Sequence, residues 1–261
     1  MPKFSKDYLI VTIPIIFMII GAWIYLDSMH MKPMGAEAAF SLLAMPMMQI
    51  WTFNDFIVMT LMWIVMMFAM MMPSTFNFLF IFSQMRLNMK TVNSPRIELT
   101  ILASVYVLLW ILFSLVAVFL QYTLHNINII NKMGVVTNNY ISAGIILFAG
   151  IYQFTDLKNN CLEKCRNPLS YIMGTKIENI RDVIKIGMSN GLFCIGCCWV
   201  LMLLLFVNGV MNLLWVLVIT IAVLAEKVFP YGNVVSKLFG ISLISWGSLI
   251  FLFEFIELIK N

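Results

Sequence analysis

Long apolar runs separated by short polar segments dominate the pattern of this chain. A helix needs roughly 20 consecutive apolar residues to cross the hydrocarbon core of a bilayer, which is about 30 Å thick. On this basis we predict membrane-spanning helices at residues 8–26, 56–82, 99–121, 137–154, 187–207, 211–229 and 239–258. The segment 137–154 is the weakest, because Asn138 and Asn139 stand at its start. The pattern therefore predicts an all-α, polytopic membrane helix bundle of about seven transmembrane helices.

The composition agrees with this prediction, since 62% of the residues are hydrophobic and only 11% are charged. The predicted spans and their short connections use nearly all of the 261 residues, so we expect a single membrane domain over residues 1–261. The first apolar run is long, and no small-x-small cleavage motif follows "WIYLDSMH". We therefore expect this run to stay as a membrane anchor instead of being removed as a signal peptide.

The distribution of lysine and arginine predicts a multi-pass orientation in the cell membrane. With the N-terminus inside, thirteen of the sixteen basic residues fall on the cytoplasmic side, and Lys32, Lys132 and Lys260 fall outside. Because basic loops stay in the cytoplasm, we expect a cytoplasmic N-terminus and an outer C-terminus. This topology accounts for the net charge of +4, so we expect membrane lipid and no nucleic acid as a partner.

All five cysteines lie on the predicted cytoplasmic side or at the inner end of a span. A reducing cytosol keeps such cysteines as thiols, so we expect no structural disulfide. Cys161 and Cys165 are four residues apart, and Cys194 precedes Cys197 and Cys198 by three and four, so each group shares one face of a helix. Cu(I) accepts two or three soft ligands, whereas zinc requires a closed tetrahedral set. We interpret the two groups as one metal site that favours Cu(I); zinc, or packing without a metal, are the alternatives.

Methionines concentrate in the first predicted outer loop, where there is no bilayer core to fill. The residues of ligand type in this loop are Met29, His30, Met31, Met34, Met45, Met47 and Met48. Thioethers select soft ions such as Cu(I). We therefore predict that Met29 and Met31, with His30 as a borderline ligand, capture or release copper at the outer face.

A second concentration of methionines lies in the segment 56–82. At spacings of three, four and four, one helical stripe carries Met59, Met62, Met66 and Met70, and Met67 and Met71 form an adjacent stripe. Met62, Met66 and Met70 are thus candidate ligands along a path between the two faces. The alternative is packing, because methionine is flexible and apolar and fills irregular gaps in a helix bundle.

Six polar residues accompany the cysteines as candidate supporting residues: Tyr152, Gln153, Lys158, Arg166, Glu226 and Lys227. Lys158 and Arg166 flank the first cysteine pair, where positive charge favours the thiolate. Glu226 and Lys227 stand at the inner end of the segment 211–229. We expect these two to form an ion pair at the membrane interface; the alternative is that Glu226 supports the cysteine site.

The chain contains, in order, Trp63, "AMMMP" at 69–73, "YQF" at 152–154, "LKNNCLEKCRNP" at 157–168, "GLFCIGCCWVLM" at 191–202 and "AEKVFPYG" at 225–232. This succession, from about residue 51 to residue 247, resembles the family of predicted metal-binding integral membrane proteins, whose members are often labelled copper chaperones. The resemblance implies metal handling. It maps the family's pattern onto Trp63, Met70, Met71, Pro73, Tyr152, Gln153, Lys158, Cys161, Cys165, Arg166, Pro168, Gly191, Cys194, Cys197, Cys198, Met202, Glu226 and Lys227. The outer methionines before residue 51 lie outside that pattern.

We therefore expect a non-enzymatic membrane protein that binds Cu(I) and transfers it, with a copper-dependent membrane enzyme or complex as the recipient. The sequence has no Gly-rich phosphate loop, nucleophile elbow or HExxH motif, which argues against a hydrolase or a kinase. Two alternatives stay open. One is a structural accessory subunit of a membrane complex, in which the sulfur-rich helices only pack. The other is a thiol redox protein that uses Cys161 and Cys165.

Overall fold

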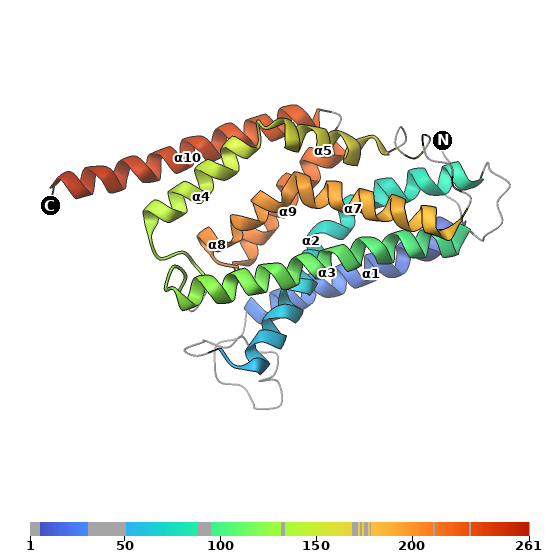
Figure 1. Cartoon of the computed structure of the whole chain (residues 1–261), viewed down its shortest axis with the longest axis horizontal. Coiled ribbons are helices and arrows are strands. Elements are labelled where there is room, and N and C mark those ends of the chain that lie inside the picture. The colour runs from blue at the N-terminus through green and yellow to red at the C-terminus, as the bar shows by residue number, and fades with distance from the viewer. Residues whose placement is uncertain are drawn as a thin grey trace.

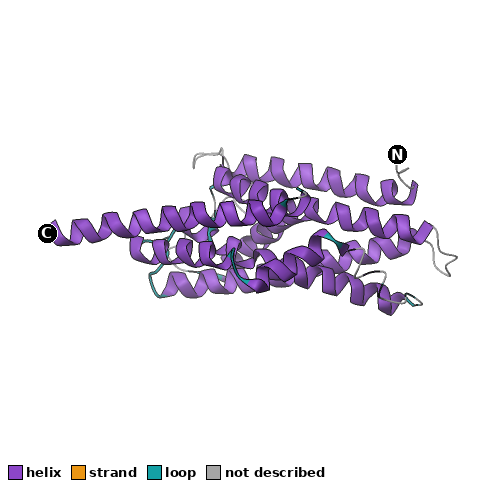
Figure 2. Cartoon of the chain, turned by 90° about the horizontal axis from the view of Figure 1, so that it is seen from above, coloured by secondary structure: helices purple, strands orange, loops and turns teal. Residues whose placement is uncertain are grey.

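The computed structural model describes residues 6–30, 51–87, 95–131, 134–168, 172, 174, 177, 179–210, 212–229 and 231–260. The helices are α1 (Lys6–His30), α2 (Phe53–Leu87), α3 (Pro95–Asn126), α4 (Asn139–Tyr152), α5 (Asp156–Arg166), α7 (Ile180–Leu203), α8 (Leu205–Asn208), α9 (Leu213–Val228) and α10 (Gly232–Lys260). Within these ranges the only β pairing is an isolated bridge between Ile130 and Val136 (Figure 2). The prediction of an all-α fold is confirmed.

A helix occupies each of the seven predicted spans, although two of these helices are short. Five stretches are long and apolar enough to cross a membrane: α1, α2, α3, α7 with α8, and α10. α4 and α5 meet at a bend of 61° and make a sixth span if taken together. α9 has 16 residues, roughly 24 Å at 1.5 Å per residue. It ends before Phe229, which precedes Pro230, and a residue in that position disfavours the helical conformation.

The helices lie along a common axis and form one bundle, in which successive long helices run in alternating directions (Figures 1 and 2). α2 packs against α1, α3 and α9; α7 packs against α3 and α5; and α4 packs against α10. The start of α1 and the end of α10 lie at opposite ends of the bundle (Figure 1). This is the path expected for an odd number of membrane crossings.

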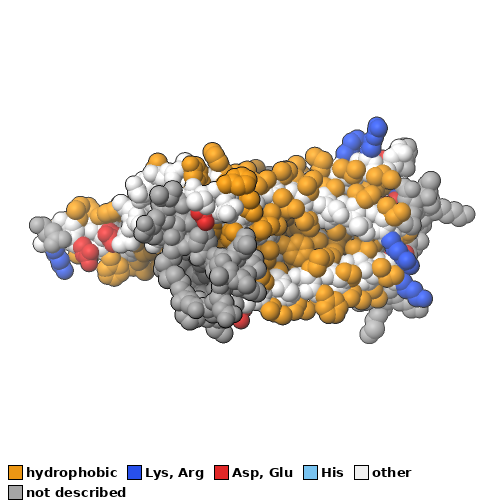
Figure 3. All heavy atoms as spheres, turned by 90° about the horizontal axis from the view of Figure 1, so that it is seen from below, with side chains coloured by type: hydrophobic (Ala, Val, Ile, Leu, Met, Phe, Trp, Pro, Cys, Tyr) orange, Lys and Arg blue, Asp and Glu red, His pale blue; other side chains and the backbone are white. Residues whose placement is uncertain are grey.

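The charged side chains divide between the two ends of the bundle. On the face shown in Figure 3, lysine and arginine side chains gather at the end where α1 begins, and the middle of the bundle is hydrophobic. This division agrees with the orientation that the basic loops predict. The apolar exterior is what contact with lipid requires.

α7 and α2 are the inner helices. Of their most apolar windows, 67% and 50% are buried inside the protein, compared with 22% for α1 and 17% for α10. The absence of side chains at Gly150 and Gly240 permits α4 and α10 to approach closely. A Cβ added to Gly240 would lie only 2.8 Å from Gln153 Cβ. This approach holds Gln153 beside α10.

Candidate functional site

The cysteines of α7 lie in the interior of the bundle. Cys194, Cys197 and Cys198 are each at most 2% exposed, and all three lie past the midpoint of this 24-residue helix. The sequence pattern predicts them at the entry to a span. α7 starts earlier, at Ile180, because the polar turns "IRDVIK" continue the helix beyond the apolar run. The cysteines therefore lie in the second half of a helix that begins before the predicted span.

Cys194 is surrounded by polar groups from three other helices. Lys227 of α9 donates a hydrogen bond from Nζ to Cys194 Sγ over 2.7 Å. The Tyr106 hydroxyl of α3 lies 3.0 Å from the same sulfur and 3.1 Å from the Met71 carbonyl oxygen of α2. Ser74 of α2 donates to that carbonyl over 2.7 Å and accepts from Lys227 Nζ over 3.3 Å. This sulfur thus has a cation and a hydroxyl group beside it in a buried position.

Cys197 and Cys198 are turned toward the preceding helical turn and toward α2. Both thiols donate to the Cys194 carbonyl oxygen, over 3.1 Å and 2.8 Å. Cys198 Sγ lies 3.9 Å from Met71 Sδ. With metal–sulfur distances of about 2.3 Å, as in zinc thiolates, two sulfurs that share an ion lie roughly 3.8–4.6 Å apart. The Cys198–Met71 pair has the spacing of two ligands of one soft ion.

The two cysteines of α5 join the same cluster. The Cys165 side chain of α5 interacts electrostatically with Cys197 of α7. Cys161 Sγ packs on the backbone of α7, since a Cβ on Gly196 would lie 2.9 Å from it. The structure therefore brings the two cysteine groups together, and glycine at 196 permits the close approach.

The described part of the chain has no group of three or more His, Cys, Asp and Glu side chains that could hold a metal ion. A closed tetrahedral zinc site is thus not formed by those residues in this conformation. A two- or three-coordinate soft ion needs fewer such groups, and the Met71 thioether adds a ligand of a further type.

Tyr152 and Gln153, at the end of α4, contact different helices. The Tyr152 hydroxyl donates to the Gly196 carbonyl and accepts from Trp199 Nε1 over 3.1 Å. It therefore fixes the turn of α7 that carries the cysteines. Gln153 Oε1 accepts from Ser236 of α10 over 2.9 Å, so this side chain links α4 to α10.

The predicted ion pair between Glu226 and Lys227 at the membrane interface is wrong. Both residues are buried, at 1% and 7% exposure, and each faces a different helix. Glu226 Oε2 accepts from Lys158 Nζ of α5 over 2.7 Å, and Lys227 contacts Cys194. Successive residues of a helix point about 100° apart, so neighbours in sequence contact different elements.

The two cations that flank the first cysteine pair are engaged elsewhere. Lys158 binds Glu226, and Arg166 Nη1 lies 3.4 Å from Asn233 Oδ1 of α10. Lys227 is instead the cation that donates to a cysteine sulfur. Lys227 thus supplies the positive charge beside Cys194, and Lys164, the third basic residue expected near the first pair, acts on Cys161.

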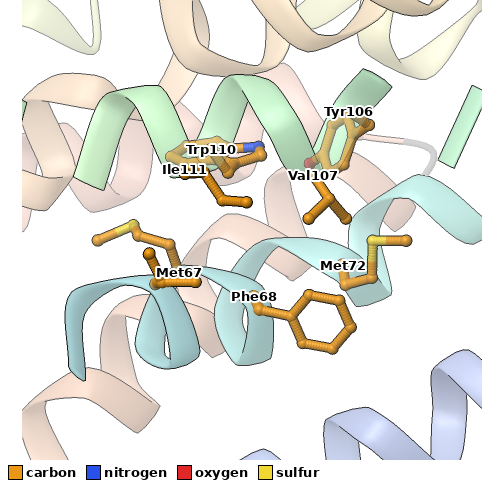
Figure 4. Close-up of a pocket in the computed structure, with 8 residues that line it drawn as sticks. Met67, Phe68, Met72, Tyr106, Val107, Trp110 and Ile111 are labelled. Atoms are coloured by element: carbon orange, nitrogen blue, oxygen red, sulfur yellow. The ribbon is translucent and has the colours of Figure 1, made fainter. Parts of the chain in front are cut away.

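The methionine stripe Met62, Met66 and Met70 lies inside the bundle, with each residue at most 3% exposed. The contact with a cysteine comes from the adjacent stripe, through Met71. Met67 and Met72 line a cavity of about 10 Å³ between α2 and α3, next to Tyr106 (Figure 4). A cavity of this volume holds about one water molecule.

Of the predicted outer ligands, Met29 and His30 end α1, and the structure describes their backbone only. Met31 and the methionines that follow it in the outer loop lie outside the described residues.

Tyr106 and Ser74 are candidate residues that the sequence pattern does not single out. Each is a hydroxyl group in the middle of a long apolar helix. Polar side chains in such positions face the interior of a bundle, so the sequence contains a signal for both. Their partners depend on how α2, α3 and α9 pack, which no local pattern specifies.

Residues 60–250 match the family model described as PpoB2, copper chaperone. This range covers more than half of the chain and includes all five cysteines, Met71 and Lys227. Comparison with curated proteins and with solved structures gives no match.

Proposed function

The chain belongs to the PpoB2 copper chaperone family, and we propose from this premise that it is a membrane protein that holds Cu(I) on the buried sulfur atoms of α7 and α2. Family membership supports copper handling in general and agrees with the resemblance seen in the sequence motifs. The ligand assignment to individual residues is our proposal.

The observation that carries the proposal is the 3.9 Å contact between Cys198 Sγ and Met71 Sδ. Cys194 and Cys197 lie within one turn of Cys198, and Cys165 adds a thiol from α5. We assign the ion to two of the three α7 cysteines as thiolates, with the thioether as a neutral third ligand. Soft ligands in low number suit Cu(I).

Zinc is the poorer candidate for this site. It takes a closed set of four Cys and His ligands in structural sites. The two histidines of the chain are His30, in the last turn of α1, and His125, in the last turn of α3 beside Trp51. Neither stands on a helix turn that carries a residue of the sulfur cluster.

We further propose that the α2 methionines lead from the outer face to this cluster, and that Met29, His30 and Met31 exchange copper there. Met62, Met66 and Met70 recur on one stripe of a helix that begins at the outer end. Their burial supports a route shielded from water as much as it supports packing. The expected recipient is a copper-dependent membrane enzyme or complex.

Replacement of Cys194, Cys197 and Cys198 together with serine tests the proposal. Cu(I) binding at about one ion per chain should be lost, because serine is a hard ligand that does not replace a thiolate. The measurement is metal content and Cu(I) competition with a chromophoric chelator, on anaerobic, detergent-purified protein. Met188→Leu is the control, since Met188 is an exposed methionine of α7 that belongs neither to the sulfur cluster nor to the α2 stripes.

If the triple serine variant bound Cu(I) with the stoichiometry and affinity of the wild type, the ligand assignment would be refuted. The same variant in the host membrane tests delivery. We expect a membrane copper enzyme to lose activity and to regain it when copper is added in excess. If the triple serine variant affected none of the host's copper enzymes, the delivery role would be excluded and copper storage would remain.

A further inference from the structure

We propose that Lys227 gives the buried sulfur site its preference for a singly charged ion, because its ammonium balances the charge of a Cu(I) ion held by two thiolates. This inference rests on the proposed function and adds to it the residue that determines which metal is held.

Lys227 lies in the last turn of α9 and reaches into the sulfur cluster. Its Nζ donates to Cys194 Sγ over 2.7 Å and to Ser74 Oγ over 3.3 Å. The residue is 7% exposed. An ammonium group in such a position is costly unless a negative group stands beside it.

None of the ion pairs among the described residues includes Lys227, and Glu226, which acts on Lys227 electrostatically, has Lys158 as its hydrogen-bond partner. The ion pairs in these ranges join Arg86 to Glu98, Arg96 to Asp7 and Lys158 to Glu226. Glu226 precedes Lys227 in sequence, yet it is directed to α5. The group placed to neutralise Lys227 is therefore the Cys194 sulfur as a thiolate, with the Tyr106 hydroxyl 3.0 Å away.

The net charge of the buried cluster differs between its Cu(I) and Zn(II) complexes. Cu(I) with two thiolates and a neutral thioether has a charge of −1, and Lys227 brings the buried cluster to zero. Zn(II) with the same ligands is neutral, so Lys227 leaves the cluster at +1. An unbalanced charge is expensive in the low-dielectric interior of a bundle. Lys227 thus favours the Cu(I) complex and disfavours the Zn(II) complex.

Zinc could reach zero charge with Lys227 only by taking a third thiolate. The described Cys, His, Asp and Glu side chains include no group of three positioned to hold one ion. The geometry and the charge of the site therefore both favour Cu(I) over Zn(II).

The test is the ratio of Cu(I) to Zn(II) affinity in Lys227→Met, a substitution that keeps the length and removes the charge. We expect the ratio to fall at least roughly tenfold, because opposite unit charges about 4 Å apart interact strongly away from water. Lys227→Arg keeps the charge and should keep most of the preference. Lys237→Met, which removes an exposed lysine of α10, should leave the ratio unchanged.

Wild-type protein that binds no Cu(I) would overturn the proposed function and this inference with it. Wild-type protein that binds Cu(I), with an unchanged metal ratio in Lys227→Met, would overturn the inference alone. Lys227→Arg gives a second decision if Lys227→Met does not fold. A loss of preference in folded Lys227→Arg, where the charge is retained, would show that charge is not what selects the metal.

Discussion

At the scale of single residues, Lys158 and Glu226 form an ion pair inside the bundle that joins α5 to α9. Their side chains are 0% and 2% exposed, and Nζ lies 2.7 Å from Oε2. Removing one partner of a buried pair leaves an uncompensated charge, which costs about 3–5 kcal/mol. We therefore expect Lys158→Met to lower the free energy of unfolding by about this amount, measured by thermal or denaturant unfolding in detergent.

Removing both partners shows how much of the lost stability comes from the unpaired charge and how much from lost packing. The double variant Lys158→Met with Glu226→Leu should recover most of the lost stability, since a buried pair contributes little beyond a hydrophobic replacement. Arg96→Gln is the matched control, because Arg96 pairs with Asp7 at 55% and 23% exposure and such pairs contribute about 1 kcal/mol or less. A single variant as stable as wild type would show that Glu226 finds another partner or a proton.

At the scale of helices, the rotation of α2 decides which methionines reach the cysteines. Met70 and Met71 are adjacent and fully buried, but only Met71 lies 3.9 Å from Cys198 Sγ. We expect Met71→Leu to weaken Cu(I) binding about tenfold, the effect of losing about 1.4 kcal/mol of ligand interaction. Met70→Leu should stay within about twofold of wild type in the same competition assay. Both swaps conserve volume, so neither should cost more than about 1.5 kcal/mol of stability.

Equal losses of affinity in the two variants would mean that α2 contributes to binding through packing and not through a sulfur ligand. The pair of variants also shows the limit of sequence patterns. Spacings of three and four are local, so they predict that Cys194, Cys197 and Cys198 share a face. Which face of α2 meets them depends on contacts with α1, α3 and α9, and periodicity alone indicates both methionine stripes equally.

At the scale of the whole molecule, hydropathy predicts the helices well and the polar contacts between them poorly. Every predicted span contains a helix, because runs of apolar residues require one in a bilayer. The contact between Cys194 and Lys227 is not part of that prediction. α7 extends past its apolar run at Ile180, and the short α9 brings its last turn to the level of Cys194.

The short helices α4 and α9 make the number of crossings the last feature to test. If all seven helical segments cross, the connection between α5 and α7 lies on the cytoplasmic side; if only the five long ones cross, it lies outside. If the N-terminus is inside, as the basic residues predict, the C-terminus is outside in both cases and does not distinguish them. We expect Lys176→Cys in intact cells to resist a membrane-impermeant thiol reagent, and Asn261→Cys to react. Wild-type protein gives the background from its five own thiols. Labelling of Lys176→Cys from outside would mean that α7 crosses the membrane in the opposite direction. The proposed route from the outer methionines to the cysteines would then be wrong.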